Sequence, residues 1–327
     1  MNTSSDKNIQ QPSIIQALLS GFNTIANKPY LMLLPILLDL FLWFGPEWRV
    51  DQIFMPFIES IPGLPGLENQ EYSQLIEEVQ SVWETLISNF DLAVTLRTLP
   101  IGVPSLIVSK PPFSNPVGNS LVFNLNTNGQ VIGLLLLFLL VGYCLGSLYF
   151  RNISNQIIKP VSNQNLKTFL KNFLQILLMP VIILLIFLIL GIPILFIFSL
   201  ITMLFPTLGN FIFIILGMLF IWNLIPLIFT PHGIFLYKLN LFPAMMTSIH
   251  VVRVSMGKTA WFLLSSVILI QGLNYLWQTP PTDNWFLLVG IFGHAFIVSA
   301  IIAASFHYFI DATKFSQTLL SQKLKSA

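Results

Sequence analysis

The chain has 327 residues, of which 55% are hydrophobic and only 9% are charged, whereas ordinary soluble domains carry roughly 25% charged residues. Together with a mean hydropathy of +0.80, this composition excludes an ordinary soluble domain and predicts a polytopic membrane protein. The net charge of +2 gives no indication of nucleic-acid binding. The single cysteine, Cys144, excludes an internal disulfide framework and a cysteine-rich metal site.

The N-terminal region predicts an amphipathic helix followed by a short membrane span. Within residues 1–29, Ser13 and Gln16 have the spacing of a capping box, and apolar residues then recur every three or four positions, as in a helix lying in the cytoplasmic interface. The first span, residues 30–46, contains Asp39 near its middle. Its apolar residues favour insertion by roughly 5 kcal/mol and Asp39 opposes it by about 3 kcal/mol, so we expect the segment to insert.

Residues 47–129 have the composition of a soluble segment. Within them, residues 71–97 predict one amphipathic helix, because apolar side chains form a stripe and most of the acidic residues lie off it. The flanking stretches, IPGLPGLEN and LPIGVPSLIVSKPPFSNPVGNS, are too rich in proline and glycine for regular helix. We therefore expect a small extracytoplasmic cap that rests on the bundle or on the lipid surface.

The next part of the chain predicts three spans. The second span, residues 130–150, contains Gly142 and Gly146 at the spacing that lets two membrane helices approach closely. A basic cytoplasmic connector, 151–172, follows it. From Asn172 to Tyr237 there is no Asp, Glu, Lys or Arg, so this block is expected to fold back as spans 173–205 and 210–230. The turn is predicted at 206–210, and a bend is expected at Pro180 or at 191–193.

The remainder predicts a cytoplasmic connector, 231–258, with an interfacial helix over 242–258, then spans 259–278 and 285–309 and a cytoplasmic tail, 310–327. The predicted fold is thus an all-α polytopic bundle of six transmembrane helices, arranged as three hairpins. Most Lys and Arg residues fall on the side of the N-terminus, and nine acidic residues fall in loop 47–129. This distribution predicts a protein of the inner (cytoplasmic) membrane with both termini in the cytoplasm and loop 47–129 outside it.

A weak internal repeat accompanies this layout. Three entry sequences, ANKPYLMLLP, FLKNFLQILLMP and SMGKTAWFLL, each place a lysine shortly before an aromatic residue; the alternative is that any span entering from the cytoplasm shows this order. The pattern resembles bacterial multi-pass membrane proteins of unassigned function and is similar to the membrane domain fused to some glycerophosphodiester phosphodiesterases. The resemblance covers most of the chain except residues 47–129. It transfers no catalytic residue, since the metal-binding acids and histidines of the phosphodiesterase domain are absent.

Asp39 is the foremost candidate for a functional residue, because an ionisable group inside the membrane is costly. His294 is predicted to lie at a similar depth on the last span and to be able to pair with it. Three interpretations remain open: a proton-relay or ion-coupling site, a hydrogen-bonded carboxyl that fixes helix packing, and a side chain that snorkels to the membrane interface.

Other polar residues in the spans leave the same choice between a pathway and simple packing. Gln271, Asn274 and Gln278 share a stripe that would line a polar cavity or join helices, and Asn223 lies beside Pro226 at a potential kink. Small residues at four-residue steps predict close packing on the last span: Ala295, Ser299 and Ala303. His307 and Asp311 continue this series and predict a pair rather than a metal site.

No nucleotide-binding, phosphate-binding or hydrolase motif is present in the sequence. We therefore predict a non-catalytic structural, accessory or assembly protein without cofactor or metal, whose partners are the lipid bilayer and possible further membrane proteins or copies of itself, and not nucleic acid. The alternatives are a small transporter or permease subunit that uses Asp39 and His294, and a membrane-embedded lipid-modifying enzyme.

Overall fold

A computed structural model gives the fold and describes residues 11–61, 70–109, 115–118, 120–158 and 165–326. This part of the chain is mainly helical and includes one short parallel pair of strands, β1 (Glu47–Arg49) and β2 (Val122–Asn124). Five helices are long and apolar enough to cross a membrane, or six if one bent pair counts as a single span. Helices satisfy their own backbone hydrogen bonds, so this architecture is the one expected of a multi-pass membrane protein.

The bent pair lies at the N-terminus. Helix α1 (Ile14–Asn27) is followed by the 3-10 helix η1 (Pro29–Met32) and by α2 (Leu33–Phe44), with an angle of 96° between α1 and the segment after it. Ser13 caps α1 by accepting a hydrogen bond from the amide of Gln16 (3.4 Å), as predicted. Helix α1 packs along the last helix, where a side chain in place of Gly21 would collide with the backbone at Ala300 and Ala304. Its location in the cytoplasmic interface stays a prediction.

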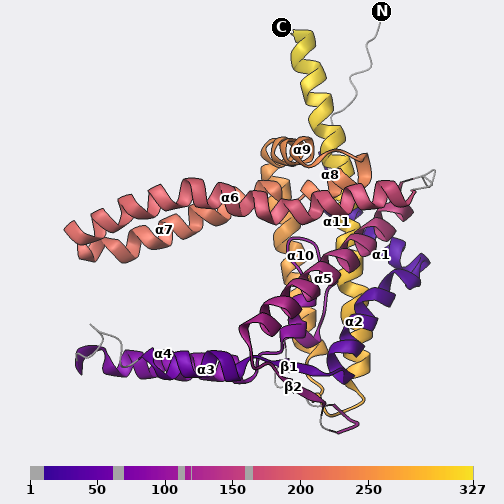
Figure 1. Cartoon of the computed structure of the whole chain (residues 1–327). Helices are drawn as coiled ribbons and strands as arrows, with labels where there is room; N and C mark the ends of the chain where they lie inside the picture. Colours follow the sequence, from indigo (N-terminus) through magenta and orange to yellow (C-terminus); the bar gives the residue numbers. More distant parts are fainter. Residues whose placement is uncertain (1–10, 62–69, 110–114, 119, 159–164, 327) are drawn as a thin grey trace, which may run out of the picture.

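Two helices form an outer hairpin, α3 (Asp51–Glu59) and α4 (Gln70–Ser88), which projects from the body of the molecule (Figure 1). The predicted helix over 71–97 is wrong at its C-terminal end. Asp91 instead begins the 3-10 helix η3 (Leu92–Leu96), because its carboxylate accepts a hydrogen bond from the amide of Ala93 (3.0 Å). A further 3-10 turn, η4 (Ile107–Ser109), follows. Residues 62–69 of the first proline-rich stretch and Lys110 lie outside the described residues.

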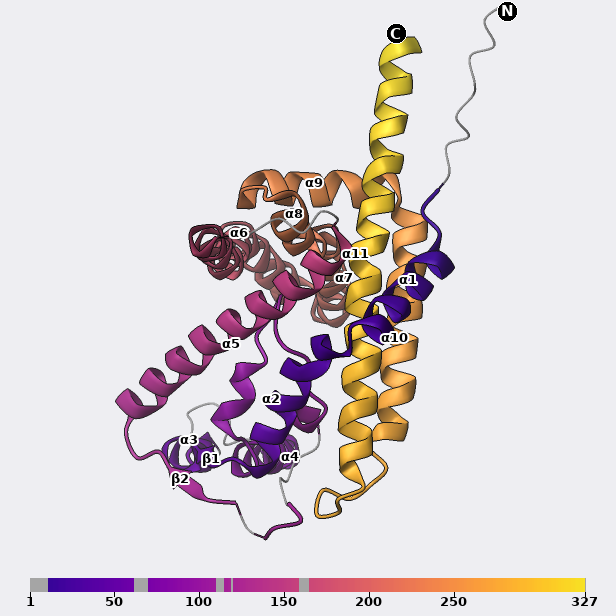
Figure 2. The same ribbon diagram turned by 90° about the vertical axis from the view of Figure 1, so that its right-hand side faces the viewer.

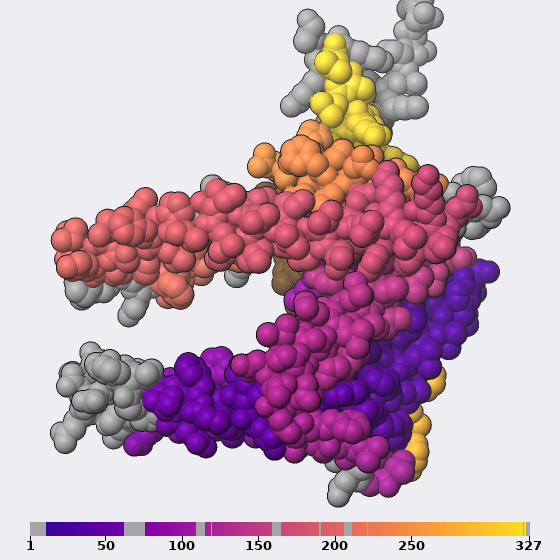
Figure 3. Space-filling view, viewed as in Figure 1, coloured from indigo at the N-terminus to yellow at the C-terminus, as the bar shows by residue number. Residues whose placement is uncertain are grey.

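The charge-free block forms a long hairpin. Helix α5 (Asn128–Ile157) leads to α6 (Leu166–Leu204) and α7 (Pro206–Leu224), and Lys159 of the connector lies outside the described residues. The break falls at Phe205, not over 206–210, because proline is favoured in the first turn of a helix and begins α7 there. Helix α6 is assigned as one helix through Pro180 and Pro193. Figures 1 and 3 show α6 and α7 as an arm that projects sideways, on the same side as the α3–α4 hairpin.

The last third of the described chain contains η5 (Ile225–Leu227), α8 (Thr230–Tyr237), α9 (Leu241–Val254), α10 (Met256–Trp277) and α11 (Leu287–Ser326). The candidate span Phe211–Tyr237 runs through α7, η5 and α8 and so extends past the end of the predicted span 210–230, with Pro226 in the 3-10 turn η5. The interfacial helix ends at Val254 rather than at 258, and α11 continues as helix through the predicted tail. Figure 2 shows α10 and α11 side by side and antiparallel.

Helix α11 is the centre of the packing, since it contacts α1, α2, α5, α9 and α10. Aromatic side chains fill the core around it, including Phe262 stacked on Tyr308 with ring centroids 4.6 Å apart. The prediction of three similar hairpins is wrong for the first pair of spans. The principal contacts of α2 are with η1, η4 and α11, and those of α5 include η3, because the chain between them enters the bundle.

Candidate functional site

The candidate site is built around Asp39, which lies on α2 and is fully buried at 0% exposure. Leu38 and Leu42 on the same helix are buried as well, so this part of α2 lies in the interior and the Asp39 carboxyl group is removed from water. A carboxylate removed from water is tolerable only if hydrogen-bond donors replace that water. The donors therefore decide what this residue does.

These donors come from residues 91–109, which we call the inserted segment. It begins at Asp91, whose carboxylate accepts hydrogen bonds from the amides of Ala93 (3.0 Å) and Trp48 (2.8 Å). Burial raises the pKa of Asp91, and these two amides oppose that rise. The segment is apolar and largely buried: Leu92, Ala93, Leu96, Ile101, Val103, Leu106 and Ile107 are at most 5% exposed.

The inserted segment wraps the Asp39 carboxylate. The Ser105 hydroxyl donates to Oδ1 (2.5 Å), the Leu106 amide donates to Oδ1 (2.9 Å) and Oδ2 (3.1 Å), and the Ile107 amide donates to Oδ1 (3.2 Å). Successive backbone amides that converge on one group form a site for an anion. Asp39 thus supplies the negative charge for an anion-binding turn of its own chain.

The depth of the inserted segment follows from its contacts with α5. A side chain at Gly142 would collide with the Leu96 carbonyl oxygen, and one at Gly146 would lie 3.0 Å from the Cα atom of Gly102. The hydroxyl of Tyr143 also donates a hydrogen bond to the Leu99 carbonyl. These glycines lie in the middle of α5, so non-helical chain reaches the middle of a candidate membrane span.

Gly142 and Gly146 were predicted to bring two helices together. They allow the inserted segment to approach α5 instead. The physical reason is the same as for two helices: a glycine has no side chain, so another backbone can come close to the helix there. Irregular backbone at membrane depth is tolerated only where protein covers it. Residues 91–109 thus pack into the bundle, a detail that the predicted cap resting on the bundle did not include.

The predicted pair of Asp39 and His294 does not form. His294 Nδ1 instead lies 2.7 Å from the amide oxygen of Asn274 on α10, and its Nε2 has no hydrogen-bond partner among the described residues. Arg97 of the inserted segment is close enough to both Asp39 and His294 to act on each electrostatically. Arg97 was not singled out from the sequence, because it was assigned to an outer helix.

The other polar candidates are dispersed. Gln271 is exposed on α10, and Asn223 is exposed on α7, where its side-chain amide donates to the carbonyl of Leu219 (2.8 Å) on its own helix. Gln278 caps the end of α10 through its backbone amide. Asn274 of this set makes a contact between helices, with His294 of α11.

The small residues of α11 lie in the interior. Ala295, Ser299 and Ala303 are all 0% exposed, and the Tyr149 hydroxyl of α5 donates to the Ser299 hydroxyl (2.7 Å). This bond joins α5 to α11 near the small-residue series. It is a structural contact that the sequence pattern did not specify.

His307 and His232 have separate partners. Nε2 of His307 lies 3.1 Å from the Thr24 hydroxyl of α1, and Asp311 pairs at 3.9 Å with Lys314, so the predicted pair of His307 and Asp311 is not formed. His232 lies 2.7 Å from the Ser305 hydroxyl. Within the described ranges no three His, Cys, Asp or Glu side chains come together as a metal site would need.

Comparison with protein-family models, with curated proteins and with solved structures finds no match. The resemblance to the membrane domain of glycerophosphodiester phosphodiesterases therefore stays a prediction.

Proposed function

We propose that the chain is a non-catalytic, multi-pass membrane protein of accessory or assembly type. The observation that carries the proposal is the set of hydrogen bonds to Asp39, whose carboxylate is occupied by Ser105, Leu106 and Ile107. An intramembrane acid that moves protons or ions must exchange its partners during a cycle. Here the same acid holds the inserted segment in place, which is a structural task.

The proposed topology has both termini in the cytoplasm and six crossings of the inner membrane. It is supported by the charge distribution, since lysines and arginines flank α6, α9 and α10 on one side and acidic residues lie on the α3–α4 side. In this arrangement the first crossing, Pro29–Phe44, is only about 24 Å long at 1.5 Å per residue. The inserted segment then packs beside a crossing shorter than the roughly 30 Å hydrocarbon core.

The lipid bilayer is the first partner that the exposed surface requires. The outer part of α6 and most of α7 expose apolar side chains, for example Phe196 (64%), Met203 (82%) and Phe211 (68%). A helix that is apolar on all sides is stable only in an apolar surrounding. The projecting α6–α7 hairpin also offers a lateral surface to another membrane protein or to a second copy of the chain, as an assembly factor would need.

A small transporter is the second candidate, and one observation favours it. The Nε2 atom of His294 is buried without a hydrogen-bond partner among the described residues, and Arg97 acts electrostatically on the same ring. Arg97 follows Leu96, whose carbonyl faces the middle of α5. A charge at that depth commonly lines an ion pathway.

Reconstitution separates the two candidates. Wild-type protein and the Asp39→Asn variant are placed in vesicles with a pH gradient. Proton flux is followed by the fluorescence of a pH-sensitive dye trapped inside, and thermal unfolding of the same preparations is measured as well. The accessory function predicts that Asp39→Asn unfolds at a lower temperature than wild type. It also predicts no protein-dependent proton flux in either sample. A pH-dependent flux that Asp39→Asn abolishes without loss of stability would establish the transporter. Incubation with labelled phospholipids, which should give no product, tests the enzyme alternative.

A further inference from the structure

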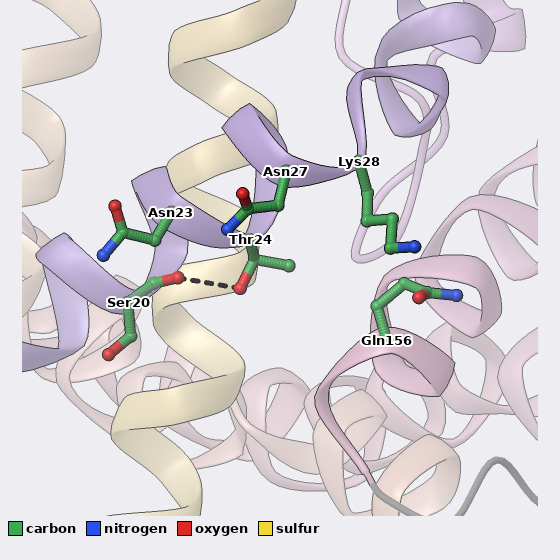
Figure 4. A pocket seen from close by; sticks show the side chains of 6 residues that line it. All are labelled: Ser20, Asn23, Thr24, Asn27, Lys28 and Gln156. Atoms are coloured by element: carbon green, nitrogen blue, oxygen red, sulfur yellow. Dashed lines mark hydrogen bonds between the residues drawn. The ribbon is translucent and has the colours of Figure 1, made fainter.

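A polar cavity of about 490 Å³ lies where α1 ends and the chain bends into η1. Its walls are six polar side chains: Ser20, Asn23, Thr24, Asn27, Lys28 and Gln156 (Figure 4). The first four belong to α1, Lys28 is the C-cap of that helix, and Gln156 lies in the last turn of α5. None of the six is acidic and one is a cation. The cavity therefore offers hydrogen-bond donors and a positive charge, which suit an anion with several oxygens.

The walls of the cavity are fixed by packing behind them. Gly21 lets α1 lie against the backbone of α11, and the Thr24 hydroxyl donates to the Ser20 carbonyl (2.7 Å) while lying 3.1 Å from Nε2 of His307. The Thr24 side chain, held in this way, loses little freedom when a ligand binds, which favours affinity.

Lys28 is available to a ligand. Its side chain is exposed, and no carboxylate of the described chain lies within ion-pair distance of it. Figure 4 shows the Lys28 side chain extending from the bend toward Gln156 of α5, while Ser20, Asn23, Thr24 and Asn27 lie together along α1 on the other side of the cavity. The ammonium group is thus free to meet a ligand beside Gln156.

We place the cavity near the headgroup region, because it lies at the last turn of α5, the end that the charge distribution assigns to the cytoplasmic side. Gln156 is about 21 Å from Gly142 along the axis of α5 at 1.5 Å per residue, and α5 is inclined to α10 and α11 (Figure 2), so its distance along the membrane normal is shorter. Lys28 also precedes Tyr30, which is 48% exposed, and exposed tyrosines are enriched at membrane interfaces.

We infer that this cavity binds a phosphate group, of the kind carried by an anionic phospholipid headgroup. Lys28 supplies the charge, and the neighbouring Gln156 amide donates a hydrogen bond to a phosphate oxygen, while the polar side chains of α1 line the rest of the cavity. The volume falls within the roughly 300–1,000 Å³ of small-ligand sites. The inference does not depend on whether the protein is an accessory protein or a transporter.

The test uses the purified full chain in neutral detergent micelles and follows the thermal unfolding midpoint during titration. Three probes are compared: short-chain phosphatidylglycerol, the matching diacylglycerol without phosphate, and inorganic phosphate. A ligand that binds only the folded protein raises the midpoint in proportion to its affinity. We expect phosphatidylglycerol to raise it and diacylglycerol to have no comparable effect. If inorganic phosphate acts at the same concentrations as the lipid, the ligand is a soluble phosphate compound.

Two variants place the binding in the cavity. Lys28→Gln should weaken phosphatidylglycerol binding at least about tenfold, because it removes a hydrogen bond from a charged donor. Lys258→Gln is the matched control, since Lys258 is an exposed lysine at the start of α10, outside the cavity, and should bind as wild type. Gln156→Leu should also weaken binding. The inference is overturned if Lys28→Gln and Gln156→Leu bind as tightly as the control, or if diacylglycerol is equivalent to phosphatidylglycerol.

Discussion

Replacing Asp39 by alanine tests whether this carboxylate holds the inserted segment. The change removes the acceptor of two buried backbone amides, those of Leu106 and Ile107, and of the Ser105 hydroxyl. A buried amide without a partner costs about 1–3 kcal/mol. The hydroxyl is able to rotate toward another acceptor, so we assign it no cost.

The two amides together give an expected loss of about 4 kcal/mol, a large part of the 5–15 kcal/mol that stabilises a typical protein. For a chain of this size we expect a fall of roughly 5–10 °C in the unfolding midpoint. Asp39→Asn keeps one acceptor oxygen but loses the charge, so its midpoint should lie between those of wild type and Asp39→Ala.

The assay is thermal unfolding of the purified protein in detergent, followed by the loss of the monodisperse peak in size-exclusion chromatography. Asp283→Ala is the control, because Asp283 is exposed in the turn between α10 and α11 and its loss should change stability by less than about 0.5 kcal/mol. If Asp39→Ala unfolds at the same temperature as Asp283→Ala, Asp39 does not hold the segment and the structural interpretation is refuted.

Three further changes test neighbouring contacts by the same unfolding assay. Gly142→Ala should destabilise the protein by about 1–3 kcal/mol, because its methyl group would collide with the inserted segment. Gly133→Ala on the same helix is the control: its methyl group meets nothing within 4 Å, and it should stabilise by about 0.5–1 kcal/mol. Equal effects of the two changes would contradict the packing of the inserted segment on α5. Tyr149→Phe should cost about 1 kcal/mol by removing the bond to Ser299, and an unchanged midpoint would argue against that bond. Burial raises the pKa of Asp91 above its usual 3.8, so its contribution to stability is full below pH 3.8 and declines as the pH rises through the raised pKa; Asp91→Asn should remove that part of the pH profile, and an unaltered profile would contradict the assignment.

The apolar runs predict the helices well, because composition and length alone decide where a helix can cross a membrane. They also identify Asp39 as exceptional. They do not identify its partners, which are mainly backbone amides 67 and 68 positions away along the chain. Backbone amides have no residue-type signature, so no pattern of side chains announces them.

The inserted segment was missed for a second physical reason. Proline and glycine in LPIGVPSLIV correctly exclude regular helix, and irregular chain is ordinarily assigned to the outside of a membrane. The available signal was that this irregular stretch, from Leu99 to Val108, has no charged residue at all. The amphipathic stripe of the preceding helix was also extended too far, because Val94 fits its spacing although Asp91 begins a new turn.

The position of the inserted segment is the central claim, and cysteine accessibility tests it most directly. In a Cys144→Ala background, single cysteines replace Ile101, which is fully buried, and Val117, which is 74% exposed. Membranes open on both sides are treated with a membrane-impermeant maleimide. We predict labelling of the cysteine at 117, protection at 101, and loss of that protection when Asp39→Ala is added. If the cysteines at 101 and 117 are both labelled rapidly in the protein that retains Asp39, residues 91–109 lie in water and the account is contradicted.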